Sequence, residues 1–335
     1  MTSKERILAT LEFRKPDRIP KCLWVLGTAN MKYGKDRINA LIDKYGVDIY
    51  GVSGPQDHGW CPEYYRKGRF VDPWGSEWNN LQDGMLGEVK NPIFDDISRL
   101  DGYVSPKDKF IEEWEEAAPD IADRIAQGRA QGKFITGGWM SIFERLQYLR
   151  GTENLYCDIA LEEECLDQMI EIVMDYYRTY IDKWLEMDID AMIFGDDWGT
   201  QISLLISPVT WRKVFKPLYQ ELIDKIKAAG KKVFFHCDGY ILELYPDFIE
   251  MGVDAINSQL WCMGVEKIAE QFAGKITFWG ELSRQETLPN GTPADVQACA
   301  DKMKRYLYKD GGLIGQCEVG SDVPFENIEA SLAAW

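Results

Sequence analysis

The sequence has few of the features that would identify several large classes of protein. Histidine occurs only twice in 335 residues, and the eight cysteines are scattered without a C-x-x-C pair. We therefore expect most cysteines to be small buried residues of a protein in a reducing compartment, with some acting as ligands or reactive thiols. The formal charge of −17 and the absence of a Lys/Arg cluster argue against nucleic acid as a partner. No run of about 18 apolar residues occurs, so we expect no membrane span.

The remaining composition is that of an ordinary globular enzyme, with 45% apolar and 28% charged residues. The opening MTSKERILATLEF alternates charged and apolar residues at helical spacing, unlike a secretory signal, so we expect a cytoplasmic location. A chain of this length can form two domains or one α/β barrel.

Apolar segments alternate with helical segments along the chain. Ser207-Pro208 has the pattern of a helix start, and Gly230 that of a helix end. This alternation predicts parallel βαβ units. The predicted strands lie within residues 20–25, 47–51, 133–138, 188–199, 232–236, 253–258, 275–280 and 312–316.

Eight such units predict a single (β/α)8 barrel, a TIM barrel, over residues 1–335. An open doubly wound sheet is the alternative, but the glycine-rich phosphate turn is missing after the first strand. Residues 52–132 exceed a normal crossover and are rich in Trp, Tyr and Gly. We interpret them as an insertion that forms a lid over the barrel mouth, or else a decorative subdomain. His58 lies in it and is expected to be a surface or lid residue.

Polar residues recur where the predicted strands end, which in a barrel is the face of the active site. They are Asp196, Asp197 and Trp198, then His236 and Asp238, then Asn257, Gln259, Trp261 and Cys262, and finally Glu281 and Cys317. Side chains alternate along a strand, so His236 and Asp238 point one way and Cys237 the other. This rim could hold Zn²⁺, but a hydrogen-bonded core histidine is the other reading of His236.

The chain resembles the uroporphyrinogen decarboxylase superfamily over nearly its whole length. The resemblance is strongest in GDDWGTQISLLISPVTWRKVFKPLYQELIDKIKAAGKKVFFHCDG and GGLIGQCEVGSDVPFENIEASLAAW, and KERILATLEFRKPDRIP is also typical. The superfamily has a (β/α)8 barrel. Its decarboxylases hold a tetrapyrrole's carboxylates with an Arg-Gln-Ala-Gly-Arg-Tyr motif after the first strand, where this chain reads LWVLGTANMKYG without arginine.

The other branch of the superfamily contains zinc-dependent methyltransferases that work with a corrinoid protein. Their His-x-Cys motif, carboxylate and distant cysteine correspond here to His236, Asp238, Gln259 and Cys317. Since Asp238 replaces a cysteine and Gln259 stands near the carboxylate position, Cys262 or Glu281 is a candidate replacement ligand. We therefore expect Zn²⁺ on His236, Asp238, Cys262 and Cys317.

The resemblance implies a methyltransferase that moves a methyl group from a small methylated substrate, such as an aryl methyl ether, to Co(I). Catalytic roles are expected for Asp196, Asp197 and Glu281, and substrate contacts for Trp139, Trp198, Asn257, Gln259 and Trp261. No corrinoid-binding Asp-x-His-x-x-Gly motif occurs, so the corrinoid (cobalamin) is expected on a separate partner protein. A homodimer, a decarboxylase acting on a tetrapyrrole-like substrate, and a non-catalytic corrinoid-binding partner remain open.

Overall fold

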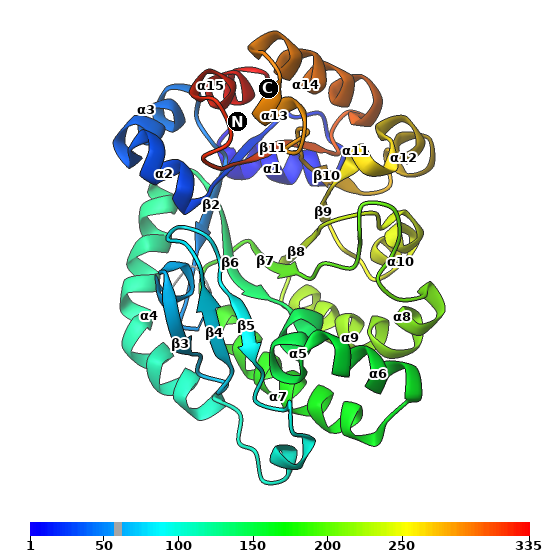
Figure 1. The fold of residues 1–335 in the computed structure, drawn as a ribbon. Coiled ribbons are helices and arrows are strands. Elements are labelled where there is room, and N and C mark those ends of the chain that lie inside the picture. Colours follow the sequence, from blue (N-terminus) through cyan, green and yellow to red (C-terminus); the bar gives the residue numbers. More distant parts are fainter. Residues whose placement is uncertain (57–61) are drawn as a thin grey trace.

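The computed structural model describes residues 1–56 and 62–335, and it confirms the predicted (β/α)8 barrel (Figure 1). Eight parallel strands pair in the order β1-β11-β10-β9-β8-β7-β6-β2. His58 lies outside the described residues, so its expected place in the lid stays a prediction. The barrel strands are β1 (Lys21–Val25), β2 (Ile49–Val52), β6 (Phe134–Met140), β7 (Ala191–Gly195), β8 (Lys232–Cys237), β9 (Ala255–Ser258), β10 (Thr277–Trp279) and β11 (Leu313–Val319).

Helices surround the barrel, as the alternation in the sequence predicts (Figure 1). The predicted start at Ser207-Pro208 is confirmed, because the Ser207 hydroxyl accepts the Thr210 N–H and Pro208 is the first helical residue. The helices of the barrel are α2 (Gly27–Tyr33), α3 (Lys35–Tyr45), α4 (Lys107–Ala130), α5 (Ile142–Arg150), α6 (Thr152–Leu161), α7 (Glu164–Leu185), α8 (Pro208–Val214), α9 (Lys216–Ala228), α10 (Tyr245–Glu250), α11 (Leu260–Met263), α12 (Val265–Phe272), α13 (Thr287–Asn290), α14 (Pro293–Leu307) and α15 (Phe325–Ala333). None of the described helices is long and apolar enough to cross a membrane.

Helix α1 (Ser3–Leu11) covers the end of the barrel opposite the site described below. It begins with a capping box between Thr2 and Glu5, in which each side chain accepts the other residue's backbone N–H. Its buried Ile7 and Leu11 belong to the same apolar cluster as Phe134 and Phe234 from inside the barrel. This packing removes the lower barrel from water and leaves the upper end for chemistry.

The fully buried Asp48 ties α1 to the junction of β1 and β2. Its carboxylate accepts hydrogen bonds from Arg6 Nη1 (2.6 Å), from Arg18 Nη1 (2.8 Å) and from the backbone N–H of Lys21 (2.7 Å). Its own N–H donates to the carbonyl of Lys21, at 2.8 Å, beside the point where the sheet closes. Burial acts to raise the pKa of Asp48, but Arg18 and the Lys21 N–H hold it below its ordinary value.

Asp48→Asn is expected to lower the free energy of unfolding by about 3–5 kcal/mol, because it leaves two arginines facing a neutral amide in a buried site. In the wild-type protein, the contribution of Asp48 to the free energy of unfolding is complete above the pKa of an aspartate in the unfolded chain, about 4. It is lost as the pH falls through the lower pKa that Asp48 has in the folded protein. Urea titrations at pH 7 and below pH 4 measure both effects. The control is Asp17→Asn, which removes another partner of Arg6 but is 41% exposed, and should cost less than about 1 kcal/mol. Equal losses in the two variants would contradict this account.

The long segment between β2 and β6 contains two different parts. Its first part holds an antiparallel sheet of β3 (Gly68–Val71), β4 (Glu77–Asn80) and β5 (Glu88–Asn91), which lies beside the barrel opening in Figure 1. The fully buried Trp78 packs edge-on against Tyr64, with ring centroids 4.9 Å apart. The second part is α4, which packs on β2 and β6 as an ordinary barrel helix. The inserted sheet is therefore shorter than the predicted 52–132, and its action as a lid stays a prediction.

Candidate metal and substrate site

The loops that follow β7 and β8 touch one another, and this contact brings the predicted acids together. A Cβ atom on Gly239 would lie 2.2 Å from the carbonyl oxygen of Gly199, and Gly239 has a φ of +81°. Only glycine allows both this approach and this backbone conformation. As a result the backbone N–H of Asp238 donates to Asp197 Oδ1 at 2.8 Å.

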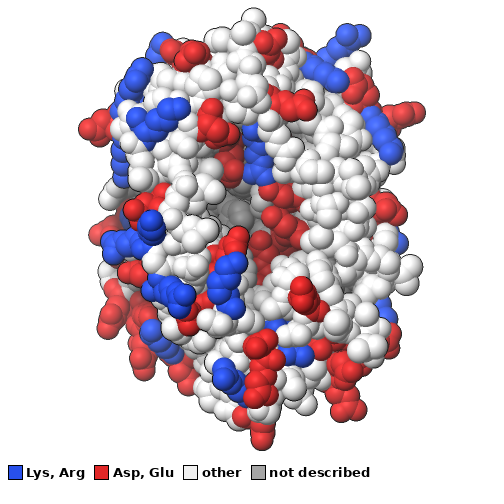
Figure 2. Space-filling view, in the orientation of Figure 1, with Lys and Arg blue, Asp and Glu red and all other residues white. Residues whose placement is uncertain are grey.

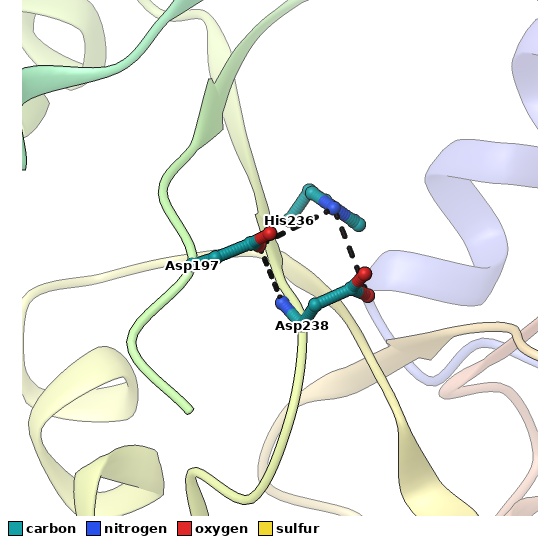
Figure 3. Close-up of side chains that lie close together, drawn as sticks. All are labelled: Asp197, His236 and Asp238. Carbon is teal, nitrogen blue, oxygen red and sulfur yellow. Dashed lines mark hydrogen bonds and ion pairs between the residues drawn. The ribbon is translucent and has the colours of Figure 1, made fainter. Parts of the chain in front are cut away.

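Three side chains converge beside this contact and could hold a metal ion (Figure 3). His236 Nε2 lies 3.7 Å from Asp197 Oδ1 and 3.8 Å from Asp238 Oδ1. One ligand atom from each residue lies within 4.8 Å of the other two. The predicted shared orientation of His236 and Asp238 is thus what the structure shows, at the end of the fifth barrel strand. Asp197 joins them as a third donor, a role the sequence analysis gave to cysteines.

The ring of His236 is oriented from behind by Asn257. Its Nδ1 lies 2.6 Å from Asn257 Oδ1, while Asn257 Nδ2 donates to the carbonyl of Trp279 (2.5 Å) and to Gln316 Oε1 (3.1 Å). Because these bonds fix the amide, its oxygen faces the ring and Nδ1 carries the proton. The lone pair of Nε2 then points toward the two carboxylates, the arrangement typical of metal-binding histidines. Asn257 therefore positions His236, rather than contacting substrate as predicted.

A cavity of about 690 Å³ opens at this end of the barrel and has His236 and Asp197 in its wall. Three indole rings and several aliphatic side chains form the apolar part of the wall. Trp24 lies edge-on to Trp279 (4.9 Å between centroids) and to Trp139 (6.0 Å), and its centroid is 5.3 Å from that of His236. Flat apolar walls beside a polar group suit a small ring-shaped ligand. Trp139, which was predicted to contact the substrate, is one of the residues that line this cavity.

The polar side of the cavity is strongly acidic. Burial, helped by Asp197 and Asp196, raises the pKa of Glu144 well above its ordinary value. Burial also raises the pKa of Glu281, which lies beside Arg284 and not in the cavity wall, and whose Oε2 has no hydrogen-bond partner. Desolvation within the cavity raises the pKa of Asp197, against the opposing effect of His236. Protons or cations are therefore favoured here.

The structure does not bring Cys317 to the metal group. Its neighbours Gln316 and Glu318 face the barrel interior, so by strand alternation Cys317 faces outward. Its Sγ donates to Ser331 Oγ of α15 at 3.2 Å, and burial raises the pKa of the thiol to about 12. The strand alternation that turns Cys237 away from His236 thus also turns Cys317 away from it, and the structure does not support the predicted ligand position of Cys317.

The other predicted cysteine ligand, Cys262, also lies apart from the three-residue group. It belongs to the short helix α11, and its Sγ donates to the carbonyl of Gln259 at 3.1 Å. The Gln259 side chain accepts from Gln201 Nε2, at 2.7 Å, so it is occupied by a neighbouring loop. Trp261 donates its indole N–H to the carbonyl of Glu281 (3.0 Å). Cys262, Gln259 and Trp261 are therefore not among the described residues that line the cavity.

Asp196 and Trp198, predicted as a catalytic and a substrate-binding residue, lie outside the described lining of the cavity. The fully buried Asp196 accepts the backbone N–H groups of Ile142 (2.7 Å), Phe143 (3.1 Å) and Glu144 (2.8 Å) at the start of α5. The fully buried Trp198 stacks on Phe143 with centroids 4.0 Å apart. Both side chains point into the packing between strand and helix and not into the cavity.

The sequence analysis missed four residues of the site, namely Trp24, Glu144, Arg284 and Glu318. Trp24 and Glu318 lie at the ends of β1 and β11, so strand alternation could have found them. Glu144 lies in the first turn of α5, and Arg284 lies in a loop after β10. No periodicity marks either of these last two positions.

Cys317→Ala is expected to retain both metal binding and turnover, because the thiol faces α15 and not His236. Metal content by elemental analysis and the methyl-transfer assay described below measure this. Cys299→Ala, another buried cysteine of the outer layer, is the matched control. Loss of metal in the Cys317 variant, but not in the Cys299 variant, would show that Cys317 is a metal ligand after all.

The comparisons with known proteins agree with this architecture. The family model described as Uroporphyrinogen decarboxylase (URO-D) matches residues 80–335. A methyltransferase from Methanosarcina mazei superposes with a TM-score of 0.74 at 18% sequence identity, covering 100% of this chain and 98% of that one. A D-psicose 3-epimerase has a TM-score of 0.43 at 10% identity, over 89% and 84% of the two chains, which carries no functional argument. No curated protein sequence matches the chain.

Proposed function

The chain belongs to the uroporphyrinogen decarboxylase family, and we propose that it is a methyltransferase acting with a separate corrinoid protein. The methyl donor in this proposal is a small methylated compound, most simply an aryl methyl ether, and the acceptor is Co(I). One observation carries the proposal: the Asp197–His236–Asp238 group lies at a cavity walled by indole rings.

The donors at this position fit a divalent metal such as Zn²⁺. His236 Nε2 has its lone pair directed at the carboxylates, and Asp238 Oδ1 is buried without a hydrogen-bond partner. One nitrogen and two oxygens can provide three protein ligands and leave a position for substrate. When bound there, zinc would supply Lewis-acid polarisation of the ether oxygen.

The chain's own residues account for the rest of the reaction. The indoles of Trp24, Trp139 and Trp279 hold the ring of the donor and exclude water from it. As the methyl C–O bond breaks, its electron pair stays on the oxygen, and the resulting phenolate needs a proton. Glu144 lines the same cavity, and because its pKa is raised its carboxyl keeps a proton to donate.

The test is to incubate the protein with a reduced corrinoid protein and a methoxy-aromatic compound and to follow the absorbance of methylcobalamin. Formation of one phenol for each methyl group transferred supports the proposal. No transfer across a panel of ethers, amines and thiols would refute it. Carbon dioxide release from a porphyrinogen would instead favour a decarboxylase.

A further inference from the structure

We propose that the substrate cavity selects against anions, so that the methyl donor is a neutral or cationic methoxy-aromatic and not a methoxybenzoate. This inference rests on the proposed function, because it names the substrate class of the same site. It depends on the distribution of charge around the cavity rather than on the metal.

The charged side chains that line the cavity are all acidic among the described residues. They are Asp197 and Glu318, with Glu144 beside them as a protonated carboxyl, and among the described residues neither lysine nor arginine lines the cavity. In the space-filling view, acidic side chains gather along one side of the central hollow, and basic side chains border it above and below (Figure 2). Among the described residues, a carboxylate inside the cavity would therefore find no lysine or arginine with which to pair.

The nearest cation, Arg284, is already shared among three carboxylates. Its Nη2 contacts Asp238 Oδ2, its Nη1 lies 2.7 Å from Glu318 Oε1, and its Nε lies 3.5 Å from Glu281 Oε1. A guanidinium has one positive charge, so this cluster keeps a net negative charge when its acids are ionised. Arg284 therefore compensates the wall of the site and is not free to bind a substrate carboxylate.

The other walls of the cavity favour a ring without a negative charge. The faces of indole rings carry negative potential, so they attract cations and tolerate neutral rings. Trp24, Trp139 and Trp279 thus act in the same direction as the acids. A tetrapyrrole with several carboxylates would meet the same repulsion, which separates this cavity from one built for polycarboxylates.

The experiment measures the binding of three ligands of similar shape and different charge: 4-methoxybenzamide, 4-methoxybenzoate and 4-methoxybenzylamine. Quenching of the cavity tryptophans reports binding at pH 7, before and after one equivalent of Zn²⁺. We expect the benzamide and the benzylamine to bind at least about tenfold more tightly than the benzoate, since like charges repel strongly in a partly dry site. Glu318→Gln should narrow this difference in affinity, whereas Glu326→Gln, an equal charge change at an exposed position of α15, should leave it unchanged.

Binding is measured without a corrinoid protein, so failure of this inference and failure of the proposed function are distinguishable. The predicted order of affinities without any methyl transfer would retain the inference and reject the proposed function. Equal or tighter binding of the benzoate, or no binding of any of the three ligands, would overturn the inference even if methyl transfer occurs.

Discussion

His236→Ala is expected to abolish metal binding and to lower methyl transfer by more than about 100-fold. Loss of a residue that only orients a ligand already costs 10–100-fold in metal affinity or activity, and His236 is the one nitrogen donor of the group. The imidazole is largely buried, so removing it leaves a small space beside Trp24 but no unpaired charge. Elemental analysis measures the metal content, methylcobalamin absorbance measures methyl transfer, and far-UV circular dichroism checks that the fold is retained.

Cys237→Ser is the matched control for this variant, since it changes the adjacent residue. The Cys237 sulfur accepts the backbone N–H of Trp198, at 3.2 Å, on the opposite side of β8. A serine oxygen can accept the same bond, so both metal and turnover should survive. If His236→Ala kept one zinc per chain and normal methyl transfer, His236 would be a core histidine and the site assignment would be wrong.

Asp196→Ala is expected to destabilise the fold by at least about 3 kcal/mol, because four buried donors lose their acceptor. Three are the N–H groups at the start of α5, and the fourth is the hydroxyl of Tyr219, which donates to Asp196 Oδ2 at 2.6 Å. Alanine can accept none of these bonds, and the site is too buried for water to replace the carboxylate. Urea unfolding at pH 7 measures the loss.

Asp197→Asn separates this structural role from a catalytic one, because it changes the neighbouring acid. The Asp197 side chain is 42% exposed, so the substitution should change the protein's free energy of unfolding by less than about 1 kcal/mol. Its metal affinity should nevertheless fall, because one ligand is lost. An Asp196→Ala variant with wild-type stability and no turnover would contradict the structural assignment and restore Asp196 as a catalytic residue.

The fold could be predicted because the barrel depends on local signals repeated eight times. Short apolar strands alternate with helices whose ends carry recognisable residues, such as Ser207 and Pro208. Strand alternation likewise placed His236 and Asp238 on one side, where the structure has them. The same rule turns Cys317 outward, because its neighbours Gln316 and Glu318 face the barrel interior.

The parts of the site that could not be predicted depend on loops and on distant contacts. Trp198 follows the end of β7, where the alternation of a strand no longer applies, and it turns into the core. Asp196 and Asp197 are neighbours with different roles because α5 begins beside one of them and the cavity lies beside the other. Arg284 joins acids from two loops and from strand β11, and no spacing in the sequence indicates that contact.

Anomalous diffraction at the zinc edge, from crystals grown with one equivalent of Zn²⁺, shows which residues hold the metal. We expect one peak at about 2.0–2.2 Å from His236 Nε2 and from a carboxylate oxygen of both Asp197 and Asp238. A peak bound to Cys262 or Cys317, or no peak within reach of His236, would contradict this expectation.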